Sequence, residues 1–232
     1  MQVYGPNVLK ELSKDMIQKV YTSRREIVKY CEENKIKYEY KDTNFLNKLC
    51  NKKHQGVIIN VYEYKYFDYK DIEGDFVVVL DHLEDPHNFG AIIRTCVAAG
   101  IKTIIIPKDR SVQVTDTVMK TSAGMLNHIK VVMVSNIVDT INKLKKDGYF
   151  IYASDMNGEN YKSVDYSGKR VLVVGNEGKG VSRLVKENSD FLVKIPMNNV
   201  CESLNASVAA GILIFEMCDI KWMKFLMMNY LA

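Results

Sequence analysis

The stretch VLVVGNEGKGVSRLV, residues 171–185, decides the fold class of this chain. Four apolar residues, three of them β-branched valines, lead directly into glycines at positions 175, 178 and 180, and a helical pattern follows from residue 181. An apolar strand that passes through a glycine-rich turn into a helix is typical of a parallel sheet covered by helices on both faces.

The same alternation extends in both directions from this stretch. Short β-branched runs predict further strands at residues 76–80, 103–106, 129–134, 150–153 and 191–195, with helices at 91–99, 115–121, 137–147, 181–187 and 204–217. The sequence therefore predicts an α/β domain over residues 76–217 with a parallel sheet. In such a sheet, ligands bind beyond the carboxyl ends of the strands.

A smaller α/β unit is predicted over residues 1–66. Strands are expected at residues 1–4, 17–21, 38–40 and 57–62, and helices at 8–13, 23–34 and 43–50, the first of them capped by Asn7. Residues 67–75, the end of a polar, tyrosine-rich run from 63, are interpreted as a linker, with an exposed hairpin as the alternative. Residues 218–232 form a C-terminal extension.

Composition restricts the class of protein further. The chain has 232 residues, 47% hydrophobic and 26% charged, which is ordinary for a globular protein. A net charge of +4 permits a nucleic-acid partner, and 26 lysines against six arginines make each arginine informative. Five scattered cysteines without a C-x-x-C pair indicate a reducing compartment and no structural zinc. With no signal sequence and no membrane-spanning run, we expect a cytoplasmic protein.

The first motif is LDHLEDPHNFGAIIRTCVAAG, residues 80–100. Asn88 is placed to cap a helix, and Arg94 is the only charge in a helix that is otherwise apolar and mostly buried. A charge in such a place needs a partner or an anionic ligand. Arg94 therefore either binds an anion or pairs for structural reasons with Asp81, Glu84 or Asp85.

The second motif is the glycine-rich turn itself. Its order, G-x-x-G-x-G, is neither the dinucleotide fingerprint nor a P-loop, because Lys179 is followed by glycine. The glycines would let main-chain groups approach a flat ligand, with the Glu177 carboxylate in the middle. The alternative is a plain turn with a solvated glutamate.

The third motif is IPMNNVCESLNASVAAGILIFEM, residues 195–217. Ser203 suits a helix N-cap, and the helix after it is apolar nearly all round, so we expect it to be buried. Ser203 and Asn205 together indicate a polar constellation. Cys201 has no obvious partner histidine and is interpreted as incidental.

In this order and spacing, the three motifs resemble those of the SpoU/TrmH family of RNA 2′-O-methyltransferases, in the SPOUT superfamily, over residues 76–217. VYGPNVLKEL at 3–12 and HQGV at 54–57 are similar to the ribosomal-protein-like RNA-binding domain that precedes the methyltransferase domain in part of the family. The chain most resembles members that methylate a guanosine of large-subunit (23S) ribosomal RNA.

The resemblance implies a trefoil knot at the C-terminal end of the sheet, formed by the second and third loops, with S-adenosylmethionine bound in it. No metal is implied. By position, the cofactor residues are Gly175, Glu177, Gly178, Gly180, Ile195, Met197, Ser203, Leu204 and Asn205. The residues implied in catalysis are Arg94, Asn88, Glu177, Ser203 and Asn205.

The resemblance also implies partners. They are RNA, either 23S ribosomal RNA or a pre-ribosomal particle, and a second copy of the chain bound through the knot region. Side chains suited to RNA contact are Lys52, Lys53, Tyr62, Tyr64 and Tyr66. The alternatives are the same chemistry on transfer RNA, or a non-catalytic RNA-binding protein on this fold. A dinucleotide-binding enzyme does not fit the glycine order.

Overall fold

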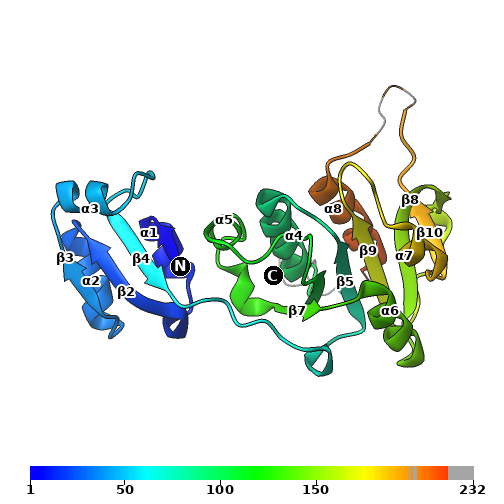
Figure 1. Ribbon diagram of the computed structural model, residues 1–232, viewed down its shortest axis with the longest axis horizontal. Helices are drawn as coiled ribbons and strands as arrows, with labels where there is room; N and C mark the ends of the chain where they lie inside the picture. The colour runs from blue at the N-terminus through cyan, green and yellow to red at the C-terminus, as the bar shows by residue number, and fades with distance from the viewer. Residues whose placement is uncertain (199, 201–202, 219–232) are drawn as a thin grey trace, which may run out of the picture.

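The computed structural model describes residues 1–198, 200 and 203–218, which form two α/β units side by side along the long axis (Figure 1). The first unit contains β1 (Gln2–Tyr4), α1 (Pro6–Glu11), β2 (Ile17–Thr22), α2 (Arg25–Glu33), β3 (Tyr38–Tyr40), α3 (Thr43–Leu49) and β4 (Val57–Val61). Its four-stranded sheet has the order β1-β4-β2-β3. In that sheet β4 is antiparallel to both neighbours and β3 is parallel to β2.

The second unit is built on a six-stranded sheet in which every pairing is parallel. The sheet has the order β10-β8-β9-β5-β6-β7. Its elements are β5 (Phe76–Asp81), α4 (Pro86–Ala98), β6 (Thr103–Pro107), α5 (Asp116–Thr121), β7 (Lys130–Val134), α6 (Ile137–Lys146), β8 (Phe150–Asn160), β9 (Arg170–Gly175), α7 (Arg183–Glu187), β10 (Phe191–Lys194) and α8 (Ala206–Met217). The predicted α/β class with a parallel sheet is confirmed; the trefoil knot stays a prediction.

Helices cover both faces of this sheet, and the central strands show it residue by residue. Val78 and Leu80 belong to the hydrophobic cluster that contains α4, α5 and α8, whereas Val77 and Val79 belong to the cluster that contains α6 and α7. All four are fully buried. A strand buried on both sides must be apolar at every position, which is why the strands appear in the sequence as continuous apolar runs.

The structure corrects several predicted element ends. β8 runs on to Asn160, well beyond the apolar run. Gly5, not Asn7, is the N-cap of α1, because Pro6 occupies the first helical position. Asp85, not Asn88, caps α4 by accepting a hydrogen bond from His87 N at 2.9 Å, again next to a proline. Asn205, not Ser203, caps α8.

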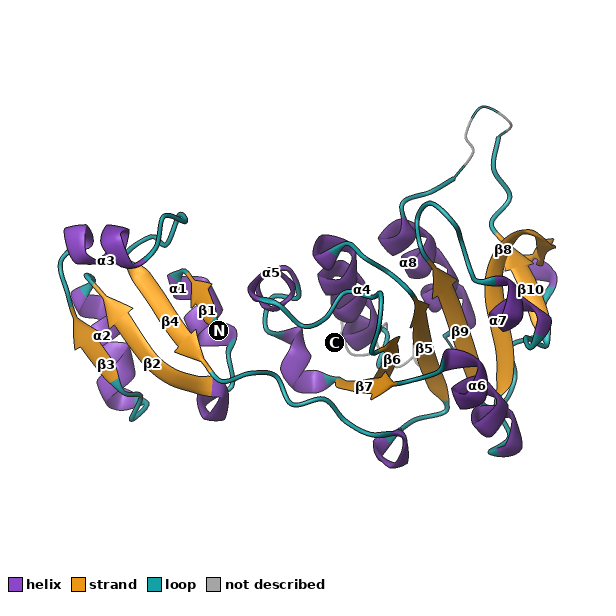
Figure 2. Cartoon of the chain, viewed as in Figure 1, coloured by secondary structure: helices purple, strands orange, loops and turns teal. Residues whose placement is uncertain are grey.

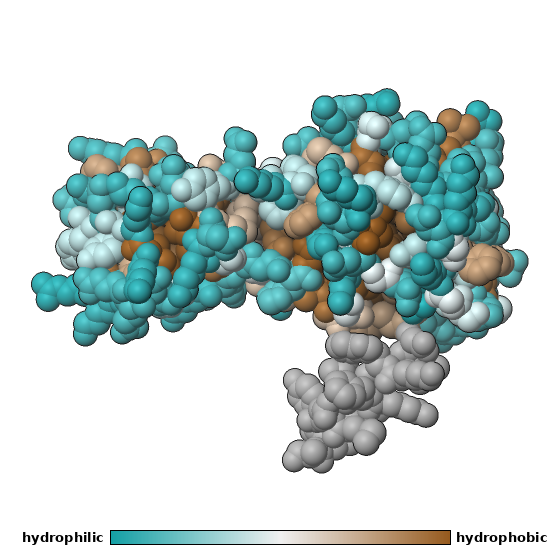
Figure 3. All heavy atoms as spheres, turned by 90° about the horizontal axis from the view of Figure 1, so that it is seen from below, coloured by the Kyte–Doolittle hydropathy of each residue, from teal (hydrophilic) through white to brown (hydrophobic). Residues whose placement is uncertain are grey.

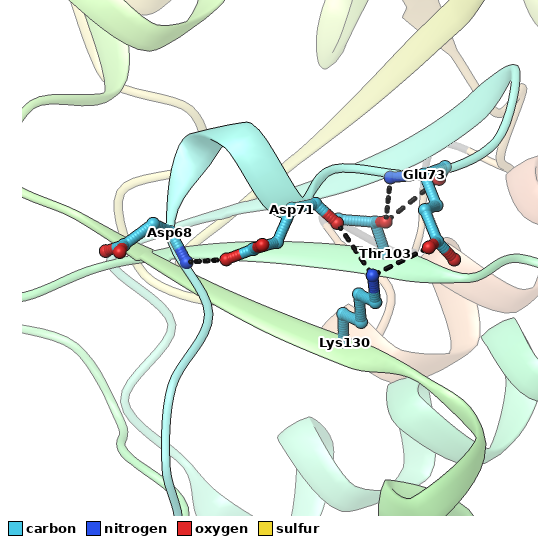
Figure 4. A network of polar contacts seen from close by, with 5 residues as sticks. All are labelled: Asp68, Asp71, Glu73, Thr103 and Lys130. Carbon is cyan, nitrogen blue, oxygen red and sulfur yellow. Dashed lines mark hydrogen bonds and ion pairs between the residues drawn. The ribbon is translucent and has the colours of Figure 1, made fainter.

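The predicted linker is docked on the second unit rather than exposed. Phe67 forms a parallel bridge with Val132 of β7. Figure 4 shows the segment after it held from below by Lys130, whose Nζ donates to Asp71 O (3.2 Å) and Glu73 Oε1 (2.7 Å). The Glu73 main chain exchanges two hydrogen bonds of 2.9 Å with the hydroxyl of Thr103. The segment thereby covers the β7 edge of the sheet, where unpaired main-chain groups would otherwise be exposed.

The two units also share buried apolar contacts. One hydrophobic cluster contains residues of both sheets, from Val3 in β1 to Met217 in α8. Seen from below, hydrophilic side chains cover most of the surface, with hydrophobic ones visible between them in the middle of the molecule (Figure 3). No helix of the described residues is long and apolar enough to span a bilayer.

Candidate functional site

A cleft lies at the carboxyl ends of β9 and β10 and against residues 154–157 of β8, at the edge where the predicted sheet should bind a ligand. It has a volume of about 1100 Å³ and is bounded on one side by α8. Most of the residues proposed from the second and third motifs line it: Gly175, Glu177, Gly178, Gly180, Ile195, Met197, Ser203 and Leu204. Segments distant in the sequence thus form one site.

The glycine-rich loop closes on itself at one wall of the cleft. Asn176 and Gly180 exchange two main-chain hydrogen bonds of 3.2 and 2.8 Å, and Gly178 N donates to Asn176 Oδ1 at 2.9 Å. A Cβ on Gly175 would lie only 2.1 Å from the Gly180 carbonyl carbon and 2.2 Å from Val181 N. The absence of a side chain at Gly175 therefore makes room for the loop's own backbone. From the sequence motif alone, this role looks the same as making room for a ligand.

Hydrogen bonds join the first motif to the second at the edge of this cleft. Asn176 Nδ2 donates to His82 O at 3.1 Å, and Ser182 N donates to the buried Asp81 Oδ2 at 2.6 Å. Asn88 is buried in the first turn of α4, and its Nδ2 donates to Glu177 Oε1 at 2.5 Å. The bond satisfies a buried amide and orients one oxygen of an otherwise exposed carboxylate. Two residues that are 89 positions apart are brought together as the combined motifs predict.

Arg94 lies on the exposed side of α4, which corrects the expectation that it starts from a buried face. Its neighbours Ile92, Ile93 and Cys96 are fully buried, so the helix directs the arginine away from the core. Among the described residues, no carboxylate pairs with the Arg94 guanidinium, and the structural pairing considered above is not found. The guanidinium is available to an anionic ligand.

The third motif contributes main-chain groups and a helix cap. The N–H groups of Ile195, Met197 and Leu204 have no hydrogen-bond partner within the described part of the chain, so they are available to a ligand. Asn205 does not line the cleft; its Oδ1 accepts from Ser207 N (3.0 Å) and Val208 N (3.4 Å) and so begins α8. Cys201 lies outside the described residues.

Asp155 is a cleft residue that the sequence reasoning missed. It follows the apolar run of β8, and its side chain is only 11% exposed. Burial opposes ionisation, but hydrogen bonds from Lys186 Nζ (2.9 Å) and Asn157 N (2.8 Å) outweigh it, so that its pKa lies below the ordinary value. The signal was available, because a Ser-Asp pair directly after the buried apolar run of a strand indicates where that strand leaves the core, at the ligand-binding edge of a parallel sheet.

The residues suggested for RNA contact divide into two groups. Tyr64 and Tyr66 pack on the core, and their hydroxyl oxygens accept hydrogen bonds from Val131 N (3.4 Å) and Val114 N (2.8 Å). Burial raises the pKa of Tyr64 to about 12, with the bond from Val131 N acting against it. Both tyrosines anchor this segment of the chain to the second unit, so their rings do not form the exposed stacking surface suggested for them. Tyr62, by contrast, is 56% exposed.

Within the described residues, no group of three His, Cys, Asp or Glu side chains could hold a metal ion. What the cleft offers a ligand is hydrogen bonds from main-chain groups, contact with apolar side chains, and the charges of a few side chains such as Glu177 and Asp155.

Comparison with known proteins identifies the family. The sequence pattern of the "SpoU rRNA Methylase family" matches residues 75–215, and that of "RNA 2'-O ribose methyltransferase substrate binding" matches residues 2–67. The chain belongs to the SpoU rRNA methylase family. This confirms the resemblance of the three motifs.

Individual relatives extend this SpoU family assignment. YacO of Bacillus subtilis (strain 168), whose name places it in the TrmH family of tRNA/rRNA methyltransferases, is 39% identical over 201 residues, covering 83% of this chain and 81% of YacO. An AdoMet-bound rRNA methyltransferase from Sinorhizobium meliloti superposes with a TM-score of 0.79 at 25% identity, covering 93% of this chain and 85% of that one. A TrmH/SpoU tRNA modifying enzyme from A. aeolicus is 33% identical with a TM-score of 0.57, covering 63% of this chain and 75% of that enzyme.

The residues that line the cleft are chemically suited to bind S-adenosylmethionine, the cofactor of this family. Apolar side chains of Ile195, Met197 and Leu204 can contact an adenine ring. Their main-chain N–H groups, which have no partner among the described residues, can form hydrogen bonds with its edge. The volume of about 1100 Å³ is ample, since pockets of roughly 300–1,000 Å³ hold ligands of this size.

Proposed function

We propose that this SpoU family member transfers a methyl group from S-adenosylmethionine to a ribose 2′-hydroxyl of RNA. The observation that carries the proposal is the hydrogen bond between Asn88 and Glu177, because it joins the first motif to the cofactor cleft. The helix that carries Arg94 is therefore connected, through Asn88, to Glu177 in the lining of the cleft that would hold the cofactor.

The protein's task in this reaction is mainly alignment. When bound, S-adenosylmethionine supplies an electrophilic methyl carbon, so the chain has to hold the two reactants in line and deal with the hydroxyl proton. Ile195, Met197 and Leu204 hold the adenosine through main-chain and apolar contact. The proposed cofactor site also includes Gly175, Glu177, Gly178, Gly180 and Ser203; Asn205, expected there from the motif, caps α8 and does not line the cleft.

Arg94 is proposed to act on the RNA. A guanidinium keeps its proton in proteins, so it is a poor general base and a good ligand for a phosphate. Exposed, and with no carboxylate partner among the described residues, Arg94 can bind the neighbouring phosphate and stabilise the alkoxide that develops as the hydroxyl loses its proton. Because Asn88 engages one oxygen of Glu177, the other oxygen can accept a hydrogen bond from that hydroxyl. Ser203 and Asn205 complete the proposed catalytic set.

For the substrate, we propose a guanosine of large-subunit (23S) ribosomal RNA, as free RNA or in a pre-ribosomal particle. The support is the N-terminal unit, which the match to the S. meliloti rRNA methyltransferase covers together with the rest of the chain. The A. aeolicus tRNA modifying enzyme matches over 63% of the chain. Transfer RNA is the competing substrate, since the name of YacO includes both.

We also propose a homodimer. α8 was expected to be buried all round, yet Val208 and Phe215 are 50% and 46% exposed, which leaves apolar surface on the helix that borders the cleft. Sedimentation at micromolar concentration should give a dimer, and a monomer would contradict this part of the proposal.

The function is tested by incubating the protein with methyl-labelled S-adenosylmethionine and unmodified total RNA, which is then separated by size. We expect alkali-resistant label at one 2′-O position of large ribosomal RNA. Label in transfer RNA would keep the chemistry and change the substrate. Absence of both label and cofactor binding would reject the function and favour a non-catalytic RNA-binding protein.

A further inference from the structure

The turn at residues 54–56 of the N-terminal unit is held by a buried histidine. His54 is 6% exposed, its Nδ1 accepts a hydrogen bond from Gly56 N at 3.0 Å, and its Nε2 lies 2.9 Å from Asn47 Oδ1 on α3. Because Nδ1 accepts, Nε2 carries the proton and donates to Asn47. Both ring nitrogens are thus engaged in holding this turn.

Two further loops converge on the same turn. The Gly56 carbonyl accepts hydrogen bonds from Ser23 N (3.1 Å) and from the buried Thr22 hydroxyl (2.9 Å). Gly56 has a φ of +77°, and a Cβ there would lie 2.8 Å from Ser23 Oγ, so only glycine fits. From the other side, Gly5 N donates to Val57 O at 3.1 Å. The segments 4–7, 22–25 and 54–57 therefore form one rigid junction.

What this junction presents to solvent is Gln55. It has a φ of +53°, an uncommon conformation for a residue other than glycine, and its side chain is exposed. Backbone strain of this kind persists only where the surrounding structure enforces it, and it is frequent at functional sites. Within the described part of the chain, the Gln55 amide forms no hydrogen bond.

Three more exposed polar side chains belong to the segments of this junction or directly precede its turn, and none has a partner among the described residues: Asn7, Arg25 and Lys53. We name these four residues the three-loop surface. It combines two amides with two cations. Cations bind the phosphates of RNA, and amides form paired hydrogen bonds with the edges of bases.

Lys52, the residue before Lys53, connects this surface to the methyltransferase unit. Lys52 Nζ lies 2.5 Å from Asp116 Oδ2, at the first position of α5, and 5.4 Å from the centre of the Tyr4 ring. α5 in turn packs on α4 so closely that a Cβ on Gly90 would lie 1.8 Å from the Thr121 hydroxyl. Figure 2 shows the loop between α3 and β4 on the same side of the molecule as the carboxyl ends of β5 and β9. The turn that carries Gln55 and the strand ends that border the cleft therefore lie on the same side of the molecule.

We propose that the three-loop surface selects the RNA, with the amide of Gln55 reading the edge of an unpaired base and Arg25 and Lys53 holding the phosphates beside it. The proposal rests on the proposed function, and it assigns the choice of substrate to this junction instead of to the tyrosines of the linker.

The test compares the full-length protein with two variants and a matched control. Gln55→Gly removes the amide but suits the positive φ, so folding is preserved. The double variant Arg25→Gln/Lys53→Gln removes both cations. The control, Lys146→Gln, removes one cation from the last residue of α6. Lys146 is exposed and has no partner among the described residues. The probes are an unmodified transcript of large-subunit ribosomal RNA and unmodified transfer RNA transcripts, measured by filter binding and by methyl transfer.

We expect Gln55→Gly to weaken binding of the ribosomal transcript about tenfold, to raise its KM to the same extent and to leave kcat unchanged. Its preference for ribosomal over transfer RNA should fall by the same factor. The double variant should bind both RNAs more weakly and reduce the slope of log affinity against log salt by about 1.4, at about 0.7 per phosphate contact with single-stranded RNA. Lys146→Gln should behave as wild type.

Affinities of the Gln55→Gly and double variants within twofold of the control would overturn the inference. Wild-type protein that bound neither RNA would overturn it too, and would point to a protein partner for this surface. Calorimetry with S-adenosylmethionine separates the two proposals. A protein that binds RNA through Gln55 yet neither binds the cofactor nor transfers a methyl group would reject the proposed function and retain this inference.

Discussion

Replacing Gly175 with alanine should damage the cofactor cleft far more than the same change three residues later. A Cβ at position 175 would meet the Gly180 carbonyl carbon at 2.1 Å, Val181 N at 2.2 Å and the Gly180 carbonyl oxygen at 2.4 Å, all of them main-chain atoms that no rotamer change can move. At Gly178 the nearest atom, Asn176 Oδ1, would lie at 3.6 Å, an ordinary contact. Gly178→Ala is therefore a matched control in the same loop.

The magnitude follows from what has to move. Relieving the contacts displaces the strand-like pair between Asn176 and Gly180 and loses two main-chain hydrogen bonds, at about 1 kcal/mol each. Overpacking a rigid site adds roughly 1–3 kcal/mol. We expect Gly175→Ala to lower the free energy of unfolding by about 3–5 kcal/mol, a large part of the usual 5–15 kcal/mol. Gly180→Ala, with a φ of +64° but open space, should cost about 1–2 kcal/mol.

The assay is urea unfolding followed by circular dichroism, together with calorimetry of S-adenosylmethionine binding. The expected order of stability loss is Gly175→Ala first, Gly180→Ala second and Gly178→Ala near zero, with cofactor affinity lost in the first variant. If Gly175→Ala unfolded within about 0.5 kcal/mol of Gly178→Ala and bound the cofactor normally, the close approach of the backbone would not be what Gly175 provides.

Three further outcomes are expected. Arg94→Lys should lower kcat at least about tenfold without changing the unfolding free energy or cofactor affinity, because the exposed guanidinium has no structural partner and a lysine lacks its two-pronged geometry; unchanged kcat would reject the phosphate role. Asn88→Ala should cost about 1–3 kcal/mol in urea unfolding, through the loss of a buried hydrogen bond to a charged group, and should also lower kcat by freeing Glu177; a variant with normal kcat would show that Glu177 needs no such orientation. Asp155→Asn should destabilise the protein by about 1–2 kcal/mol at pH 7. Since the folded pKa of Asp155 is lowered, this contribution is present above its ordinary pKa and lost as pH falls below it, so wild type and variant should converge in unfolding experiments below about pH 4; a constant difference would contradict the ionic origin.

The fold could be predicted from the sequence because its signals are local and repeated. A strand such as β5 is buried on both faces, so Phe76–Asp81 is apolar up to the last residue, the buried Asp81, whose carboxylate accepts a hydrogen bond from Ser182 N at 2.6 Å. Helix caps were harder to assign. Ser203 and Asn205 are both good capping residues two positions apart, and only the path of the chain decides that Asn205 faces the free N–H groups of α8.

Side chains that act between distant segments mark the limit of the sequence reasoning. Arg94 was expected to be partly buried because its neighbours are apolar, yet the rotation of α4 against the sheet directs it outward, and that rotation depends on packing against α5 and α8. Tyr64 and Tyr66 have the composition of a stacking surface, but their hydroxyls accept from main-chain N–H groups about 48 to 67 residues away. No pattern in the residues around these tyrosines indicates the positions of those donors.

The same argument explains why the sequence shows the motif HQGV but not the three-loop surface to which it contributes. The sequence HQGV resembles a family pattern, but of its residues only Gln55 is exposed, and the others form the support for it. His54 bonds Gly56 and α3, and Gly56 makes room for Ser23. A short motif can thus consist mostly of residues that hold one side chain in place, and the part that meets a partner can be separated from its support only when burial and hydrogen bonds are known. The glycine-rich loop follows the same rule, since Gly175 serves the backbone of the loop while the Glu177 side chain projects from it toward Asn88.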